Sequence, residues 1–236
     1  MRIVSALMLA ALAATAAGSD WEGNASIGGL LTSGNSEVTQ LDAGLELSRT
    51  LYGPALTGDL KATASYGSQD EETYREKYLT ETGLRWDFTE HDYSRLMGYW
   101  TRDELSGISH EYGGAAGLGR RLLAGGSLSA SMEAGAGLLH RESTVDSILE
   151  TTTGYVSLEA DWAATEAWSL SESVRLKNDF QNSENYSLES VFEASSSITG
   201  NLSFLVGYDI TYHNLPPVQG NEKTDTALRL QLRMAI

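Results

Sequence analysis

The 236-residue chain contains no cysteine and only three prolines, and its basic residues are half as numerous as its acidic ones. Without cysteine it can form no disulfide, no zinc–thiolate site and no cysteine nucleophile. Lys and Arg number 16 against 32 Asp and Glu, a formal net charge of −16. This balance argues against nucleic acid or an anionic membrane surface as the main partner, because both attract basic proteins. After the first segment there is no run of about 20 apolar residues, which excludes a transmembrane helix there.

The first 17 residues have the parts of a secretory signal peptide. Met1–Arg2 gives a positive start, residues 3–14 are apolar and uncharged, and Ala14–Thr15–Ala16 fits the small-x-small rule for cleavage. We therefore expect a cleaved leader over 1–17 and a mature chain over 18–236. An uncleaved membrane anchor is the less favoured alternative, because the apolar stretch is shorter than a bilayer span.

Most of the remaining chain alternates between apolar and polar residues with a period of two, which is typical of a strand with two unlike faces. The clearest case is 226–236, where Leu, Met and Ile occupy the even positions from 228 onward. The segment 93–103 is ambiguous in phase, and with it the sequence predicts twelve strands. The ten other alternating segments are 21–31, 40–48, 56–66, 80–88, 112–122, 128–138, 156–162, 168–180, 186–198 and 202–213.

Alternation also fits a soluble β-sandwich, but three further features favour a membrane barrel. The predicted strands average about ten residues, they are even in number, and short connections alternate with mostly longer, acidic ones. The short connections include Gly53–Pro54 and Gly200–Asn201, and the longer ones are 69–74, 141–150 and 214–224. Aromatic residues gather at strand ends on the apolar parity, as in the interfacial girdles of such barrels. The sequence therefore predicts an all-β, antiparallel up-and-down transmembrane barrel with both termini in the periplasm.

No catalytic, cofactor-binding or metal-binding constellation stands out. The acidic run Asp70–Glu71–Glu72 fits a solvated loop tip better than a cation site between lipopolysaccharide phosphates. Gly117-x-Gly119 and Gly135-x-Gly137 are followed by no helix, so we interpret them as strand glycines that let the barrel curve. The histidines have neither metal-site spacing nor a serine two residues later, so we expect solvated loop histidines, with catalysis as the alternative. These histidines are His91, His110, His140 and His213.

The polar parity would face the lumen, and it carries charges of both signs. The candidate lumen charges are Arg175, Lys177, Glu189, Glu193, Asp209, Arg229 and Arg233. Pairing the two strands around a turn at Ser183 predicts Lys177 near Glu189 and Arg175 diagonal to Glu193. Such pairs either stiffen and plug the interior, which we slightly favour, or line a narrow pore with a selective field. Since inward acids outnumber inward bases, an open lumen would prefer cations.

Several stretches are similar to one known family. They are Gly28-Gly29-Leu30-Leu31-Thr32-Ser33-Gly34-Asn35-Ser36, then 102–107 with 115–119, then 133–137, and finally Pro216–Pro217 with 223–226. Together they resemble the salt-induced, YdiY-like outer-membrane proteins (domain of unknown function 481) over nearly the whole mature chain. The resemblance implies an outer-membrane barrel in Gram-negative bacteria, and it supplies no activity and no catalytic residue. The chain departs from the usual barrel pattern at its end, where Ile236 stands in place of a terminal aromatic residue.

The sequence thus predicts an outer-membrane barrel that acts as a structural protein or as a narrow, weakly cation-preferring channel for small solutes. Two alternatives are an outer-membrane enzyme acting on lipid or peptide and a soluble periplasmic β-protein. We expect a monomer that is not an enzyme and has no cofactor. Its expected partners are outer-membrane lipid, lipopolysaccharide and, during biogenesis, the barrel-assembly machinery, with no nucleic acid among them.

Overall fold

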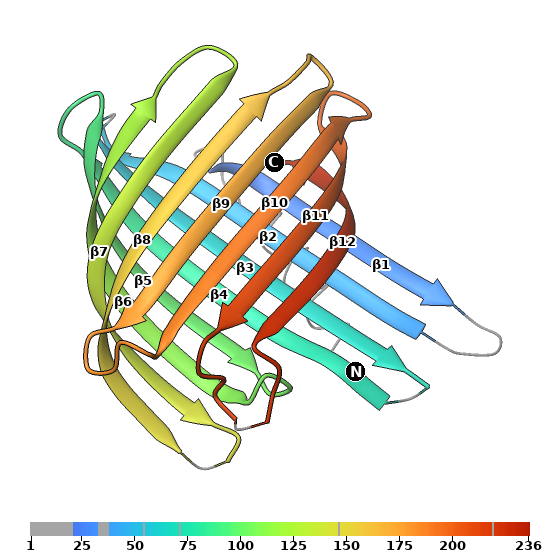
Figure 1. Cartoon of the computed structure of the whole chain (residues 1–236). Coiled ribbons are helices and arrows are strands. Elements are labelled where there is room, and N and C mark those ends of the chain that lie inside the picture. The colour runs from blue at the N-terminus through green and yellow to red at the C-terminus, as the bar shows by residue number, and fades with distance from the viewer. Residues whose placement is uncertain (1–20, 33–37, 54, 71, 146, 219) are drawn as a thin grey trace.

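The computed structural model describes residues 21–32, 38–53, 55–70, 72–145, 147–218 and 220–236, and in these residues twelve strands form a closed antiparallel barrel (Figure 1). Each strand pairs with its neighbours in sequence, and β1 pairs with β12 to close the sheet. The predicted barrel is therefore confirmed, whereas the predicted leader lies outside the described residues. The strands are β1 (Glu22–Thr32), β2 (Val38–Tyr52), β3 (Leu56–Gln69), β4 (Glu72–Asp87), β5 (Asp92–Asp103), β6 (Ile108–Leu123), β7 (Leu128–Ser143), β8 (Ile148–Ala163), β9 (Trp168–Asp179), β10 (Tyr186–Ser197), β11 (Leu202–His213) and β12 (Thr224–Ala235).

The strands β1 and β12 close the sheet along part of their lengths. The closing pair runs from Asn24 opposite Ala235 to Gly28 opposite Gln231. This matters in a bilayer, where unpaired backbone groups find no water to bond with. Among the described residues, no helix is both long enough and apolar enough to span a membrane.

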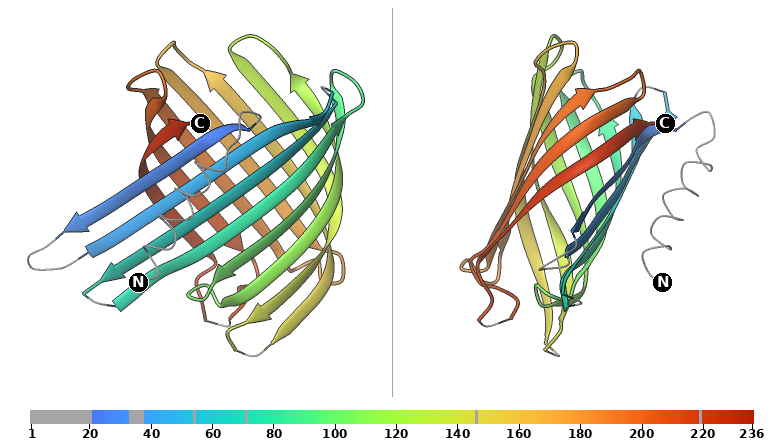
Figure 2. Two further views of the ribbon diagram at one scale, coloured as in Figure 1. Left: turned by 180° about the vertical axis from the view of Figure 1, so that it is seen from behind. Right: turned by 90° about the vertical axis from the view of Figure 1, so that its right-hand side faces the viewer.

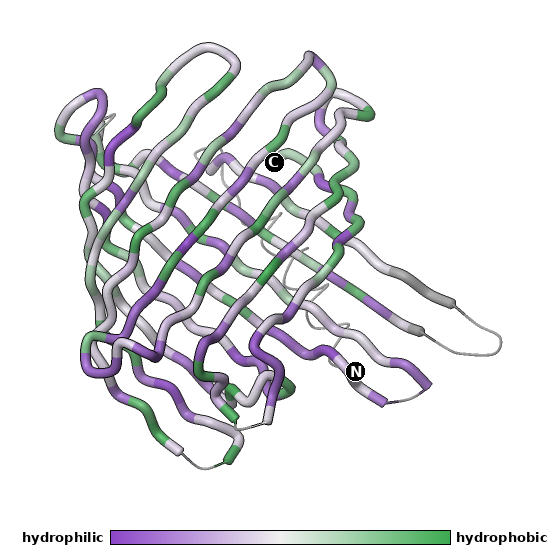
Figure 3. The backbone as a smooth tube through the Cα atoms, in the orientation of Figure 1, coloured by the Kyte–Doolittle hydropathy of each residue, from purple (hydrophilic) through white to green (hydrophobic). Residues whose placement is uncertain are grey.

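The outer and inner faces follow the predicted alternation of the sequence. On β12, the Leu230 side chain is on the outside and the residue is 50% exposed, whereas Gln231 beside it is 5% exposed and faces the interior. Hydropathy alternates along the strands in the same way (Figure 3). Since most strands present large exposed apolar side chains on the outside, the outer face suits lipid rather than water, which speaks against a soluble β-protein.

Aromatic side chains lie near both ends of the outer face, as predicted. Trp86, Phe88 and Trp168 are exposed near the rim where β1 begins and β12 ends, which we call the terminal rim. Phe180 and Tyr186 are exposed near the opposite rim. These positions suit the two interfacial belts of a membrane barrel.

The strands β2 to β4 and β6 to β8 are several residues longer than predicted, because they continue past the apolar band into polar sequence. Across the barrel the strands have 11 to 16 residues. The predicted long loops at 69–74 and 141–150 are wrong: Gln69 pairs directly with Glu72, and only 144–147 separates β7 from β8. Charged residues beyond the membrane do not end a strand, since ladder hydrogen bonds persist there. Asp70 supports the tight turn with a φ of 50°.

The ambiguous segment 93–103 is β5, and its odd-numbered residues face inward. Tyr93 is buried, whereas Leu96 is exposed on the outside. Alternation does not indicate which residues of this strand face inward, because the large side chains of Tyr93 and Tyr99 point inward, whereas Gly98 and Arg102 are on the outer face.

The barrel is flattened, so that two broad walls face each other across the lumen. In Figure 1 the strands β8 to β11 lie in front of β2 to β4, and the side view in Figure 2 is much narrower than the front and back views. This shape brings side chains of β9 within reach of β4, β5 and β6, although none of these strands is its neighbour in the sheet.

Candidate functional site

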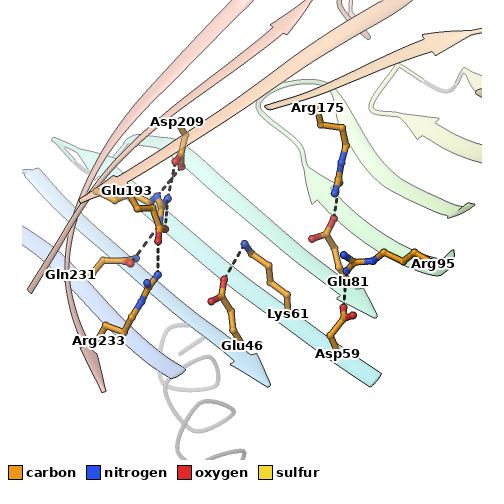
Figure 4. Close-up of polar contacts among 11 residues, drawn as sticks. Glu46, Asp59, Lys61, Glu81, Arg95, Arg175, Glu193, Asp209, Gln231 and Arg233 are labelled. Carbon is orange, nitrogen blue, oxygen red and sulfur yellow. Dashed lines mark hydrogen bonds and ion pairs between the residues drawn. The ribbon is translucent and has the colours of Figure 1, made fainter. Parts of the chain in front are cut away.

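The charged lumen is the candidate site, and most of the predicted lumen charges take part in ion pairs there. Arg175, Lys177, Glu193, Asp209, Arg229 and Arg233 each lie within 4.0 Å of an opposite charge. Glu189 has no Lys, Arg or His nitrogen within that distance among the described residues. The ion pairs form one group on the wall β10–β12 and a second group that crosses the lumen (Figure 4).

The first group is centred on Arg229. Its Nε and Nη2 each donate to the Asp209 carboxylate at 2.8 Å, a two-point contact that suits the planar guanidinium. Nη2 also donates to Glu193 Oε1 at 3.1 Å, and Arg233 Nη2 donates to Glu193 Oε2 at 2.7 Å.

A glycine explains how Arg229 spans three strands. Gly207 lies between Glu193 and Arg229 in the sheet, opposite both of them. A Cβ atom at this position would come within 2.9 Å of the Arg229 guanidinium. The missing side chain therefore lets the arginine lie flat across β11 and reach Glu193.

The second group joins opposite walls of the barrel. Arg175 Nη1 of β9 contacts Glu81 Oε1 of β4 at 3.3 Å, as Figure 4 shows. We call this contact the strut. Closer to the opposite rim, Lys177 Nζ lies 3.5 Å from the Tyr99 hydroxyl and 4.0 Å from Glu111 Oε1. The other carboxylate oxygen of Glu111 accepts a hydrogen bond from Arg141 Nε at 2.5 Å.

The partners Glu81, Tyr99 and Glu111 were not among the predicted site residues. Strand alternation places each of them on an inner face, but it does not indicate which walls meet. That information depends on the flattened shape of the closed barrel.

The predicted register of β9 and β10 is wrong by two residues. Arg175 lies opposite Glu189, and Lys177 lies opposite Ser187, so Lys177 is only diagonal to Glu189. The cause is the turn geometry. Asp179 accepts hydrogen bonds from the backbone N–H of Gln181 at 2.8 Å and from the Asn185 side-chain amide at 3.0 Å, which closes the loop around residue 182 rather than Ser183.

The wall formed by β5 to β8 is filled by inward tyrosines that lie on glycines. A Cβ atom at Gly113 would collide with the Tyr99 ring, and one at Gly119 would collide with the Tyr93 ring. Tyr155 covers Gly117 and Gly135 in the same way, and its hydroxyl donates to Glu133 at 2.5 Å. The glycines interpreted as aids to curvature thus also make room for aromatic rings, as in designed barrels.

The glutamates behind these rings belong to the same packed layer. The Tyr99 hydroxyl donates to Glu111 at 3.0 Å, and Glu111 and Glu133 are both buried. Their neighbours on β7 to β9 are buried as well. The buried inner-face residues of this half include Tyr93, Glu111, Glu133, Leu139, Ser143, Thr151, Tyr155, Ser157 and Asp179.

The four histidines do not share one site, although His110 and His140 both contact the Tyr112 ring. Only His91 is in a turn; the expectation of loop positions is wrong for the other three, which lie in strands. On the outer face, the His110 ring stacks between Trp100 and Tyr112. His140 contacts Glu150 at 3.0 Å, and His213 is the last residue of β11.

Among the described residues, no group of three His, Cys, Asp or Glu side chains is placed to hold a metal ion. A pocket near the opposite rim is lined by Arg141, Lys177, Asp179 and His213 among others, and its free space is about 30 Å³. Such a space holds about two water molecules. The lumen therefore offers electrostatic interactions from paired charges of both signs.

Comparison with known proteins agrees with this architecture. The family model described as a protein of unknown function, DUF481, matches residues 25–236. The uncharacterized protein YdiY of Escherichia coli (strain K12) is 28% identical over 212 residues, which are 90% of this chain and 82% of that protein.

Solved structures of outer-membrane proteins share the fold. The NanC porin matches with a TM-score of 0.57 at 11% identity, covering 90% of this chain and 100% of that one. An outer-membrane channel from Pseudomonas putida F1 matches with a TM-score of 0.55 at 10% identity, covering 92% of this chain and 95% of that one. The fold is therefore that of an outer-membrane barrel of Gram-negative bacteria.

Proposed function

The chain belongs to the DUF481 family of proteins of unknown function, and from that premise we propose that this outer-membrane barrel is a narrow, weakly cation-preferring channel for small solutes and ions. Its mouths would face the two sides of the outer membrane, with the short turns of the terminal rim in the periplasm, as is usual for such barrels.

One observation carries the proposal: charged side chains in the middle of the lumen face open space. Glu46 Oε1 and Lys61 Nζ pair at 3.0 Å near the centres of β2 and β3, and each side chain is 42% exposed. A plugged interior would bury such a pair, as the packed wall buries Glu111 behind Arg141. An exposed ion pair at mid-barrel supports an aqueous lumen.

The size of the barrel supports a narrow passage. Twelve strands about 4.8 Å apart and tilted by about 40° give a mean backbone radius of roughly 12 Å. Eight strands leave an interior filled by side chains, and sixteen leave a wide channel. Flattening and the strut reduce the free bore further, which favours ions and small solutes over larger molecules.

The charge distribution supports a weak preference for cations. Glu159 and Asp161 are exposed on the inner face of β8 toward the terminal rim, and the whole chain carries a net charge of −16. Acidic mouths concentrate cations, and salt weakens this effect by screening. The paired bases inside the lumen keep the preference small.

A planar-bilayer recording tests the function. The purified barrel should give a small conductance, far below that of a general porin, and its reversal potential across a KCl gradient should indicate cation preference that declines as salt rises. Anion preference would refute the charge argument. Complete electrical silence would favour a second candidate, a structural barrel stiffened across its lumen, which the strut between Arg175 and Glu81 supports.

The remaining expectations are part of the same proposal. The barrel would be monomeric and non-enzymatic, exported with a cleaved leader, embedded among lipopolysaccharide and lipid, and inserted by the barrel-assembly machinery, with no nucleic-acid partner. N-terminal sequencing of protein from outer-membrane fractions tests cleavage near residue 17. Lipase and protease assays on the purified barrel test the absence of enzymatic activity.

A further inference from the structure

We propose that water and ions cross the barrel off-centre, along the inner faces of β2, β3 and β4, and that Glu46 and Lys61 determine the charge selectivity of this route. The inference rests on the proposed channel function for conduction, whereas the position of the water-filled route stands on the lumen geometry itself.

The first argument is the exposure of paired charges. On β2 to β4, the side chains of Lys77, Lys61 and Arg85 are 39%, 42% and 39% exposed although each has an acidic partner. In the other ion pairs of the lumen the bases are less exposed, down to 14% for Arg229 and 13% for Arg141. The most exposed paired bases of the lumen therefore lie on one wall.

The second argument is that these exposed charges follow one another from rim to rim. Lys77 lies toward the opposite rim on β4, Glu46 and Lys61 lie at mid-barrel, and Arg85 lies near the terminal rim. Figure 4 shows Glu46 and Lys61 between the Arg229 group and the strut. The exposed side chains thus occur at both rims and at mid-barrel rather than at a single mouth.

The third argument is that much of the rest of the lumen is packed at mid-barrel. The tyrosines on glycines fill the wall of β5 to β8, and the strut, which ends at Glu81 on β4, limits the route at mid-barrel to the side of β2 and β3. On the other side Leu205, Gln231, Gly28 and Asp42 lie opposite one another across four strands. Leu205, Gln231 and Asp42 are buried, which closes the lumen beside β1 and β12.

The route has a charge pattern of its own. Along it the bases Lys77 and Arg85 are more exposed than their partners Asp103 and Asp87, at 14% and 16%. At the central pair Glu46 and Lys61 are equally exposed. Exposed bases toward both rims and at mid-barrel offset the acidic mouths, which explains why the preference for cations is weak.

The absence of cysteine from the chain gives a direct test. Thr63→Cys on β3 and Ser48→Cys on β2 place a thiol on the route, and Ser157→Cys places one in the packed wall of β8. All three positions are on inner faces. A methanethiosulfonate reagent that carries a trimethylammonium group is applied to the folded barrel in lipid bilayers, modification is measured by intact mass, and heat-modifiable gel migration confirms folding.

We expect Thr63→Cys and Ser48→Cys to react at least ~10-fold faster than Ser157→Cys, because a buried thiol is shielded from the reagent. In the same bilayers, modification at Thr63→Cys should reduce the conductance. Lys61→Gln should raise the ratio of potassium to chloride permeability about twofold, whereas Arg120→Gln, which removes an exposed base from the outer face of β6, should leave it unchanged.

The outcomes separate the route from the channel function. Fast modification at Thr63 and Ser48 without any current supports the water-filled route and overturns the channel. A conducting barrel in which Thr63→Cys reacts no faster than Ser157→Cys overturns the route and keeps the channel. An equal selectivity change in Lys61→Gln and Arg120→Gln overturns the assignment of selectivity to the central pair.

Discussion

At the scale of single residues, the outer and inner faces of one strand impose opposite requirements. Leu230 is on the outer face of β12 near its centre, with half of its surface exposed to the membrane region. Thr63 is on the inner face of β3, next to Lys61, in the exposed part of the lumen. The same substitution should therefore have different costs at these two positions.

Leu230→Arg should destabilise the barrel by ~2–4 kcal/mol, because a guanidinium at the bilayer centre loses its hydration. Thr63→Arg should cost less than ~1 kcal/mol, since its charge remains in lumen water. Unfolding titrations in lipid vesicles measure both. Similar free-energy losses at the two positions would contradict the assigned faces.

The ion pairs in the lumen also differ in how exposed their charges are and in how many partners hold them. Arg229 is 14% exposed and is held by two carboxylates, whereas Lys61 is 42% exposed and has one. Removing one partner of an enclosed pair leaves a charge without compensation, which is costlier than removing both.

A double-mutant cycle on Arg229→Ala and Asp209→Ala should give a coupling of at least ~0.5 kcal/mol. The matched cycle on Lys61→Ala and Glu46→Ala should give a smaller value, because exposed pairs contribute little. The observable is the free energy of unfolding in urea. Additive losses in the first cycle would mean that water screens Arg229 as fully as Lys61.

At the scale of strands, the tyrosine–glycine contacts hold the wall of β5 to β8 in one arrangement. Gly113 faces inward beneath Tyr99, and Gly114 beside it faces outward with only a carbonyl oxygen, 3.7 Å away, near its missing Cβ. Two adjacent glycines on β6 thus have unlike surroundings, so each serves as the control for the other.

Gly113→Ala should destabilise the barrel by ~1–3 kcal/mol, since the added methyl group displaces a packed ring. Gly114→Ala should be neutral or slightly stabilising, because alanine lowers the entropy of the unfolded chain. The unfolding midpoints of both variants, compared with that of the unaltered barrel, measure these changes in stability. In the double variant Tyr99→Ala, Gly113→Ala, the loss should fall short of the sum of the single losses.

The strands themselves could be predicted from the sequence, because alternation depends only on which face meets lipid. β12 illustrates this with its apolar even positions. The phase of β5 could not be predicted, since Tyr93 and Tyr99 are large residues that pack inward on glycines. The ends of β3 and β4 were missed because ladder bonding continues through the charged residues next to Asp70.

The lumen charges could be predicted as a set, but their partners could not. The alternation of apolar and polar residues alone places Arg175 and Arg229 on inner faces. The partner of Arg175, Glu81, is 94 positions away in the chain and belongs to the facing wall. The register of β9 and β10 depends on hydrogen bonds that turn residues donate to Asp179, and alternation does not indicate these hydrogen bonds.

At the scale of the whole molecule, the flattened barrel depends on contacts between its walls. Backbone ladders hold neighbouring strands together, but they do not fix the distance between β9 and β4. The strut links these strands at 3.3 Å, and Lys177 adds a contact to Tyr99 on β5. Both contacts pull the walls together around the exposed route.

Breaking the strut should therefore widen the lumen. Arg175→Gln and Glu81→Gln should each increase the single-channel conductance, since the walls lose an attraction and the route gains free cross-section. Arg229→Gln is the matched control, because its partners Asp209 and Glu193 are on β11 and β10 of its own wall. Its conductance should stay near that of the unaltered barrel.

Conductance and thermal unfolding measured on the same preparations distinguish this effect from general loosening. A strut variant should show a larger conductance with only a modest fall in unfolding temperature, because the exposed fraction of Arg175 and Glu81, 20% and 26%, limits the strength of their pairing. An unchanged or smaller conductance in both strut variants would mean that the wall separation is set by the tyrosine packing instead. The ion pair across the lumen would then serve only to neutralise charges that the flattened shape has already brought together.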